Sequence, residues 1–150
     1  MSINEKQDEL IEEFEMFDDW MERYQLICDY ARELKKNPMP AEDKIDRNKI
    51  DGCQSTVWFT ARMENGLLVF NGDSDALLVK GIVALFLAVL SGHTPKEIID
   101  ADLYFIDRIG LREHLSPTRS NGVAAMLKQM KLYALAYNKG EWLVVSGLVG

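Results

Sequence analysis

The fold is decided by the stretch TVWFTARMENGLLVF, residues 56–70. From Val57 to Met63 every second residue is apolar, an alternation typical of a half-buried strand. Asn65-Gly66 follows, and this dipeptide favours the tight two-residue turn of a hairpin. The stretch therefore predicts two antiparallel strands joined directly to each other.

A two-residue turn also fixes the register of the two strands, because each residue before the turn then faces a set residue after it. The expected pairs are Glu64 with Leu67, Met63 with Leu68 and Ala61 with Phe70. One face of the hairpin is then apolar, and a slip of one residue would turn it to solvent. The expected members of this face are Val57, Phe59, Ala61, Met63, Leu68 and Phe70.

Turn and helix signals follow the hairpin. Residues 71–75 (Asn-Gly-Asp-Ser-Asp) predict a turn and a helix cap. Leu77–Leu90 is apolar all round and predicts a central buried helix, which ends at Gly92. Thr94-Pro95-Lys96-Glu97 combines an N-cap, a proline at N1 and a capping-box glutamate, and Ser116-Pro117 opens the last helix in the same way.

That last helix is expected to present an apolar face to the core and to stop at Gly140. Its expected buried residues are Val123, Met126, Leu127, Met130, Ala134 and Tyr137. The apolar segment Trp142–Val149 after it has two interpretations, a late strand or a loosely docked end.

Two helices are expected before the hairpin. Ser2 and Glu5 form a capping box for a helix that runs to about Met16, and Asp18 caps a second one that Asn37-Pro38 stops. The second helix has its apolar positions at helical spacing. They are Trp20, Tyr24, Ile27, Cys28, Ala31 and Leu34.

Met39–Gly52 is a long charged loop with room for a short helical turn, and loops of this length are often functional. Together these elements predict one α+β domain over residues 1–150, with a small antiparallel sheet packed against several helices.

Composition narrows the classes of partner. The 150 residues are 47% apolar and carry a net charge of −7, so the chain is globular and repels phosphate backbones and anionic lipid. Nucleic acid and membranes are therefore not expected as partners, whereas a basic protein surface is left open. The acidic stretch Glu9–Glu22 is either a solvated helix face or such a docking surface.

Other features of the sequence bear on the cellular compartment and on metal binding. Two cysteines are too few for a disulfide scaffold, and no Cys/His spacing fits a structural zinc site. Residues 1–9 lack the apolar core of a signal peptide. The apolar run 77–90 is shorter than the ~20 residues that cross a bilayer. We expect a soluble protein of a reducing compartment, with free thiols.

Cys53 is the main candidate for chemistry. It follows Gly52 on a turn at a strand end, where a thiol can face solvent or fold against the apolar layer. The alternative is an inert buried cysteine. Asp51 disfavours the thiolate, whereas Arg47 and Lys49 favour it.

Other residues leave further alternatives open. Cys28 falls on the apolar stripe of the second helix and is expected in the core. His93 and His114 are the only histidines, and a Cys53–His pair would make a thiol hydrolase, although no spacing supports one. Arg119 at position N3 of the last helix opposes the helix dipole, so it holds a carboxylate elsewhere, receives a partner or is simply solvated.

Four blocks of the chain resemble the SufE family of sulfur-acceptor proteins. They are Asn48–Trp58 around Gly-Cys-Gln-Ser, Gly72–Ala76, Val79–Gly81 and His114–Gly122 around Leu-Ser-Pro-Thr-Arg-Ser. With the leading helices the resemblance covers about residues 5 to 137, and residues 138–150 lie outside it.

The resemblance implies a sulfur carrier rather than an enzyme, with the fold of the SufE and IscU-type proteins. Such a protein takes persulfide sulfur from a cysteine desulfurase onto a loop cysteine, here Cys53. It stimulates the desulfurase and passes the sulfur to an iron–sulfur scaffold in the cytoplasm. The pyridoxal phosphate belongs to the desulfurase, so no cofactor or metal is implied for this chain.

The resemblance also implies residues that support the Cys53 loop or dock the partner. They are Gly52, Gln54, Ser55, Asp73, Asp75, His114 and Arg119. We further expect a loop with two positions, in which Cys53 rests against leucine and methionine side chains and swings out on docking. A thiol hydrolase and a pure interaction adaptor stay as competing functions.

Overall fold

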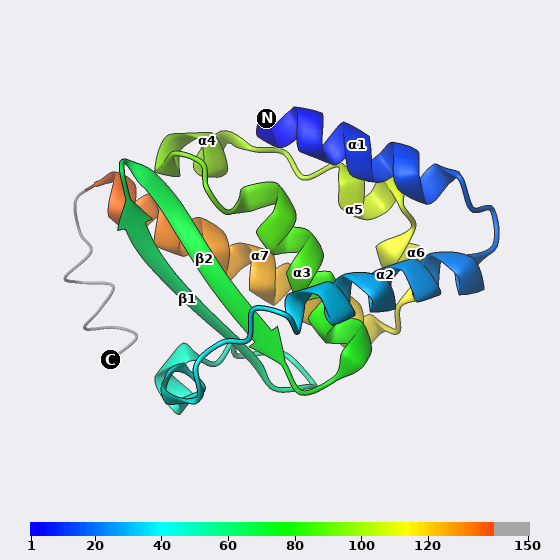
Figure 1. Ribbon diagram of the computed structural model, residues 1–150, viewed down its shortest axis with the longest axis horizontal. Coiled ribbons are helices and arrows are strands. Elements are labelled where there is room, and N and C mark those ends of the chain that lie inside the picture. Colours follow the sequence, from blue (N-terminus) through cyan, green and yellow to red (C-terminus); the bar gives the residue numbers. More distant parts are fainter. Residues whose placement is uncertain (140–150) are drawn as a thin grey trace.

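Residues 1–139 are described by the computed structural model, in which two antiparallel strands and seven α-helices form an α+β fold (Figure 1). The predicted stop at Gly140 and the segment Trp142–Val149 lie outside the described residues. In Figure 1 the hairpin lies on one side of the central helix α3 (Leu77–Leu90), and α1 (Ile3–Glu15) and α2 (Trp20–Leu34) lie on the other.

The predicted hairpin and its register are confirmed. β1 (Val57–Glu64) and β2 (Leu67–Ser74) pair as Glu64 with Leu67, Met63 with Leu68 and Ala61 with Phe70. Asn65 and Gly66 both have positive φ, as the tight turn requires. Four members of the apolar face are buried, but Met63 is 40% exposed, because it lies beside the turn at the end of the hairpin.

The predicted turn at residues 71–75 is wrong. β2 continues through Asn71 to Ser74, since these residues pair with Val57–Thr60 of β1, and pairing overrides their turn propensity. Gly72 serves close packing instead. A Cβ on it would lie 2.8 Å from Val83 of α3 and 2.9 Å from the Phe59 ring.

The buried central helix is confirmed with the predicted bounds, Leu77–Leu90, and has ten buried residues. On its α2 side, Gly81 allows the backbone of Ile27 to approach closely. Cys28 on α2 is 2% exposed, so its predicted place in the core is also confirmed.

Three helix starts follow the predicted caps. Capping boxes begin α1 at Ser2 and α4 (Pro95–Asp100) at Thr94, and Ser116 caps α7 (Pro117–Asn138). Asp18 is the wrong cap for α2, because Asp19 accepts the hydrogen bond from the Met21 N–H. α2 also ends at Leu34, before the predicted proline stop.

The remaining elements are short. α5 (Phe105–Arg108) and α6 (Leu111–His114) join α4 to α7, and the loop before the hairpin contains 3₁₀ turns at Ala41–Asp43 and Asp46–Asn48. Of the predicted core residues on α7, Leu127 and Tyr137 are only partly buried. Tyr133 is buried although it was not predicted to be.

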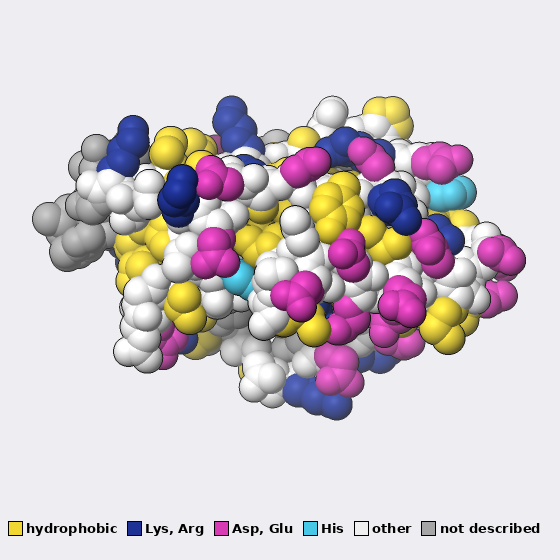
Figure 2. Space-filling model, turned by 90° about the horizontal axis from the view of Figure 1, so that it is seen from above, with side chains coloured by type: hydrophobic (Ala, Val, Ile, Leu, Met, Phe, Trp, Pro, Cys, Tyr) yellow, Lys and Arg dark blue, Asp and Glu magenta, His cyan; other side chains and the backbone are white. Residues whose placement is uncertain are grey.

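The acidic stretch Glu9–Glu22 covers the second half of α1, the turn after it and the start of α2. It holds seven of the 24 acidic side chains of the chain and no lysine or arginine. Figure 2 shows acidic side chains gathered over the half of the upper face that α1 occupies. Some of them form ion pairs at the surface, such as Glu15 with Arg108.

Candidate functional site

Cys53 lies on a loop of five residues, 51–55, that is tied at both ends. Before the loop, the Ile50 N–H donates to the Val57 carbonyl at 2.9 Å. After it, the Thr56 N–H donates to Asp75 Oδ1 at 3.1 Å. Gly52 has a φ of 89°, which a residue with a side chain adopts only under strain. The glycine therefore sets the bend that turns the thiol toward the protein.

The thiol faces a small cavity between the loop, α3 and α7. The cavity volume is about 10 Å³, close to the space of a single water molecule. Its walls are lined by Gln54, Ser55, Val79, Ile82, Arg119, Gly122, Val123 and Met126. The apolar part of this wall is valine, isoleucine and methionine, so the expected leucines are absent from it.

Gly122 forms the floor under the sulfur atom. The Cys53 Sγ lies 3.7 Å from the Gly122 carbonyl oxygen, to which the S–H donates weakly. A Cβ on Gly122 would lie 3.6 Å from Sγ, which is already contact distance. A larger side chain at position 122 would therefore occupy the place of the thiol.

The surroundings keep this thiol protonated. Burial raises the pKa of Cys53, and the negative charge of Asp51 raises it further. Arg47 and Lys49, which the sequence offered as opposing charges, are not among the causes of the shift. Because the thiolate is the nucleophile, Cys53 is a weak one while it lies in the cavity.

Arg119 stands at the rim of the cavity. Its side chain is exposed, and its backbone N–H donates to the Oγ of the N-cap residue Ser116 at 3.3 Å. Within residues 1–139 its guanidinium forms no ion pair. Gln54, also exposed, lines the same cavity. Two predicted docking residues are thus beside the thiol and accessible.

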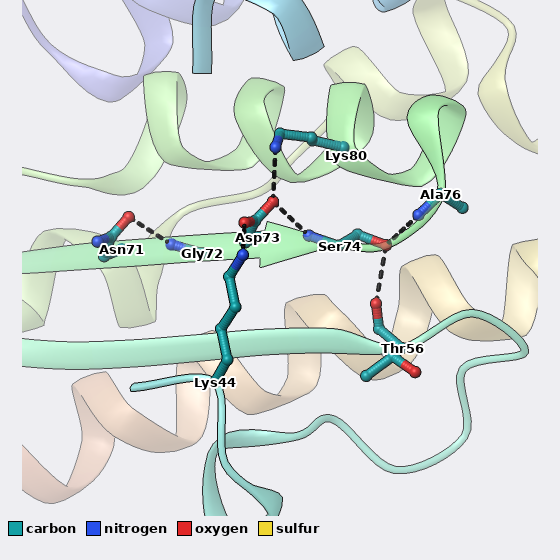
Figure 3. A network of polar contacts seen from close by, with 8 residues as sticks. All are labelled: Lys44, Thr56, Asn71, Gly72, Asp73, Ser74, Ala76 and Lys80. Atoms are coloured by element: carbon teal, nitrogen blue, oxygen red, sulfur yellow. Dashed lines mark hydrogen bonds and ion pairs between the residues drawn. The ribbon is translucent and has the colours of Figure 1, made fainter. Parts of the chain in front are cut away.

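Asp73 and Asp75 support the loop from different positions. Asp75 binds the Thr56 N–H directly, at the end of the loop. Asp73 is 3% exposed and lies between Lys44 and Lys80 (Figure 3). Burial alone would raise the pKa of Asp73, but hydrogen bonds from the two lysines and from the Ser74 N–H lower it overall.

The structure does not bring a histidine to the thiol. His114 stacks on Trp20 with ring centroids 4.3 Å apart. His93 lies by the N-terminus, with Nε2 at 3.1 Å from the Met1 carbonyl oxygen. Neither lines the Cys53 cavity, so the Cys–His pair of a thiol hydrolase is not formed.

Trp58, whose neighbours Val57 and Phe59 on β1 are buried, is itself partly covered by this chain. The ammonium group of Lys44 lies 5.6 Å from its ring centroid. Its indole Nε1 is buried without a hydrogen-bond partner among the described residues. The same residues contain no cluster of three His, Cys, Asp or Glu side chains placed to hold a metal.

Comparison with known proteins fits this arrangement. Residues 8–134 match the family described as "SufE: Fe-S metabolism associated domain". The chain belongs to the SufE family. Membership supports a role in iron–sulfur metabolism, and the matched region contains the Cys53 loop and every residue of its cavity wall.

Two relatives support this assignment, and a solved structure supports the fold. The chain is 41% identical to an uncharacterized SufE-like protein of Synechocystis, over 88% of this chain and 82% of that one. It is 39% identical to one of Rhizobium meliloti, over 83% and 91%. The solution structure of a hypothetical protein from Thermus thermophilus, 23% identical, has the same fold with a TM-score of 0.70 over 86% and 93%.

Sequence reasoning missed most of the cavity wall of this SufE-family chain. Val79 and Gly122 lie in blocks that carried the resemblance, but Ile82, Val123 and Met126 were visible only as core positions. Four predicted site residues do not line the cavity, namely Gly52, Asp73, Asp75 and His114. Gly52 bends the Cys53 loop and the two aspartates lie at its support, whereas His114 stacks on Trp20. Among the described residues, no helix combines the length and apolarity needed to cross a membrane.

Proposed function

We propose that this protein accepts sulfane sulfur from a cysteine desulfurase on Cys53, stimulates that enzyme and relays the sulfur to iron–sulfur cluster assembly. The observation that carries the proposal is the Cys53 thiol, which lies on a loop tied at both ends and faces a tight, largely apolar cavity. Such a thiol is sheltered at rest and close enough to the surface to be presented.

The transfer is an exchange between two thiols and one sulfur atom. The Cys53 thiolate attacks the outer sulfur of the persulfide on the donor cysteine. The donor's S–S bond breaks, its cysteine leaves as a thiolate, and a new S–S bond forms on Cys53. The proton lost from Cys53 is taken up by the departing thiolate, so no external oxidant or reductant takes part.

The structure supports this chemistry because the second cysteine of the chain is buried and cannot react with a persulfide on Cys53. A second accessible thiol would attack the persulfide and close a disulfide. The only other cysteine, Cys28, is 2% exposed on α2. The bound persulfide would therefore wait for an external acceptor.

Activation is expected to come from the partner. Inside the cavity, burial and Asp51 raise the pKa of Cys53, so the thiolate is scarce at neutral pH. Outward movement on docking removes the burial, and a cationic partner surface would offset Asp51. Exposed Arg119 and Gln54 at the rim are the side chains we expect to meet that partner.

The test is desulfurase turnover with and without this protein. Wild type should raise turnover as it is titrated in, whereas Cys53→Ser should leave turnover at the basal level. Cys28→Ser is the matched control, because it removes the same atom from a position without access. Equal stimulation by Cys53→Ser and wild type would refute the acceptor role and favour a pure interaction adaptor.

A further inference from the structure

A buried carboxylate joins the loop that leads to Cys53 with the helix that lines its cavity. Asp73 Oδ2 lies 2.8 Å from Lys44 Nζ, and its Oδ1 lies 2.9 Å from Lys80 Nζ. Oδ1 also accepts the Ser74 N–H at 2.8 Å. Figure 3 shows Asp73 on β2 with the two lysines approaching it from opposite sides.

The three residues come from three parts of the site. Lys44 belongs to the long loop 39–52, at whose end Cys53 follows. Lys80 belongs to α3 and stands between Val79 and Ile82, two residues of the cavity wall. Asp73 belongs to β2, and the next residue, Ser74, donates from Oγ to the Thr56 carbonyl at 2.8 Å. Asp73 thus connects the segment before Cys53 with α3, and its neighbour Ser74 holds Thr56 after the loop.

A series of contacts connects Lys44 with the backbone just before Cys53. The Lys44 ammonium covers the Trp58 ring, and Trp58 forms a β-bridge with Lys49. Ile50, next along the chain, is 9% exposed and bonded to Val57. The segment before Cys53 is therefore held through Lys44, Trp58 and Ile50, and it has no helix or strand of its own beyond 3₁₀ turns.

The two lysines differ in how readily they are released. The Lys80 side chain is 14% exposed on the central helix, whereas the Lys44 side chain is 35% exposed on the loop. Water therefore reaches the ammonium group of Lys44 more easily than that of Lys80, and screening weakens the more exposed pair. The ion pair on the loop side is the one that can open while the core stays folded.

We propose that Lys44 is a positioning residue for Cys53, and that its ion pair with Asp73 latches the loop and limits how often the thiol leaves its cavity. Lys44 does not touch the cavity, so it acts through the loop. Opening the latch loosens the segment before Lys49, so that the Lys49–Trp58 bridge and the bonds of Ile50 and Thr56 alone hold the Cys53 loop.

The test is the rate at which iodoacetamide alkylates Cys53 in the isolated protein. Mass spectrometry of the peptides measures this rate. Lys44→Met should raise this rate by about five-fold, because one partly screened ion pair is lost. Lys44→Arg, which keeps the charge and can bind Asp73, should stay within about two-fold of wild type. Rates are taken across a pH series, so that a change of thiol pKa is separated from a change of access.

Two controls separate a latch from a general loss of charge or stability. Lys49→Met removes a lysine from the same loop whose only ion pair among the described residues is to exposed Asp46, so the Cys53 rate should not change. Cys28, sealed in the core, reports opening of the whole fold. The latch is refuted if Lys44→Met leaves the Cys53 rate unchanged, matches Lys49→Met, or accelerates Cys28 equally.

This test needs no desulfurase. A failed latch would leave the sulfur-acceptor proposal intact, since wild type and Cys53→Ser would still differ in desulfurase turnover. Conversely, a latched thiol that stimulates no desulfurase would refute the proposed function and keep the latch.

Discussion

The two cysteines of this chain lie in contrasting regions. Cys28 sits within α2, where helical hydrogen bonds and packing against α3 hold it at 2% exposure. Cys53 is also covered, but by a loop of five residues with a left-handed glycine and ties only at its ends. The difference lies in the backbone around each thiol, because only the Cys53 loop can move without unfolding a helix.

The largest expected effect is the difference between the two thiols themselves. In the native protein Cys53 should be alkylated at least about a hundred times faster than Cys28, because Cys28 requires opening of the core. Peptide mass spectrometry after timed labelling measures both rates in one sample. Similar rates for the two cysteines would show that the Cys53 loop has no local motion of its own.

A larger side chain under the thiol should widen the difference in labelling rate between the two cysteines. In Gly122→Val the Cβ would already be at contact distance from Sγ, so the added methyl groups should crowd Cys53, push it outward and raise its labelling rate roughly ten-fold. Ala124→Val is the matched control, because Ala124 is exposed on the same helix. An unchanged Cys53 rate in Gly122→Val would mean that the cavity is not where the thiol rests.

Acid should weaken the support beneath the loop. The pKa of Asp73 is lowered in the fold, so its stabilisation is complete above the ordinary carboxyl range and is lost as pH falls through the lowered value. Asp73→Asn should cost about 1–2 kcal/mol of unfolding free energy at neutral pH, and this difference should shrink in acid.

Chemical denaturation at several pH values measures this difference. Lys44 and Lys80 face the carboxylate as its ion-pair partners, and Asp73 is the acidic group of the three, so a change that appears in acid is assigned to Asp73. The carboxylate and its two lysines do not support the fold as described if the difference between wild type and Asp73→Asn is constant with pH.

The smallest expected effect concerns the charge next to Cys53. Asp51→Asn removes one of the two causes that raise the pKa of the thiol, so the labelling rate near neutral pH should rise about two-fold. Glu42→Gln removes an exposed carboxylate from the preceding 3₁₀ turn and should have no effect. A pH profile of the labelling rate that is identical in Asp51→Asn and wild type would leave burial as the sole cause.

Local signals in the sequence predicted much of the fold. The Asn65-Gly66 turn set the hairpin register, and the caps at Ser2, Thr94 and Ser116 set helix starts, because each depends on residues a few positions apart. The strand through Asn71–Ser74 was missed, since its turn-forming residues are held by pairing with β1. Local propensity gives no information on that pairing.

The site divides in the same way. Cys53 and its glycine were predicted from their place before the strand and from the family blocks, and the structure puts the thiol on that turn. The cavity wall and the Lys44–Asp73 ion pair were not predicted, because tertiary packing brings together segments far apart in the sequence. From the sequence alone, Lys44 on a charged loop is expected to be solvated, because nothing local indicates that Asp73 is its partner.

The most direct measurement of the central claim is the location of transferred sulfur. The protein is incubated with a cysteine desulfurase and cysteine, then separated without reductant and analysed by mass spectrometry. The account predicts one added sulfur atom on the peptide that contains Cys53, in wild type and in Cys28→Ser, and none in Cys53→Ser. Sulfur gained equally by Cys53→Ser, or found on Cys28 in wild type, would contradict it.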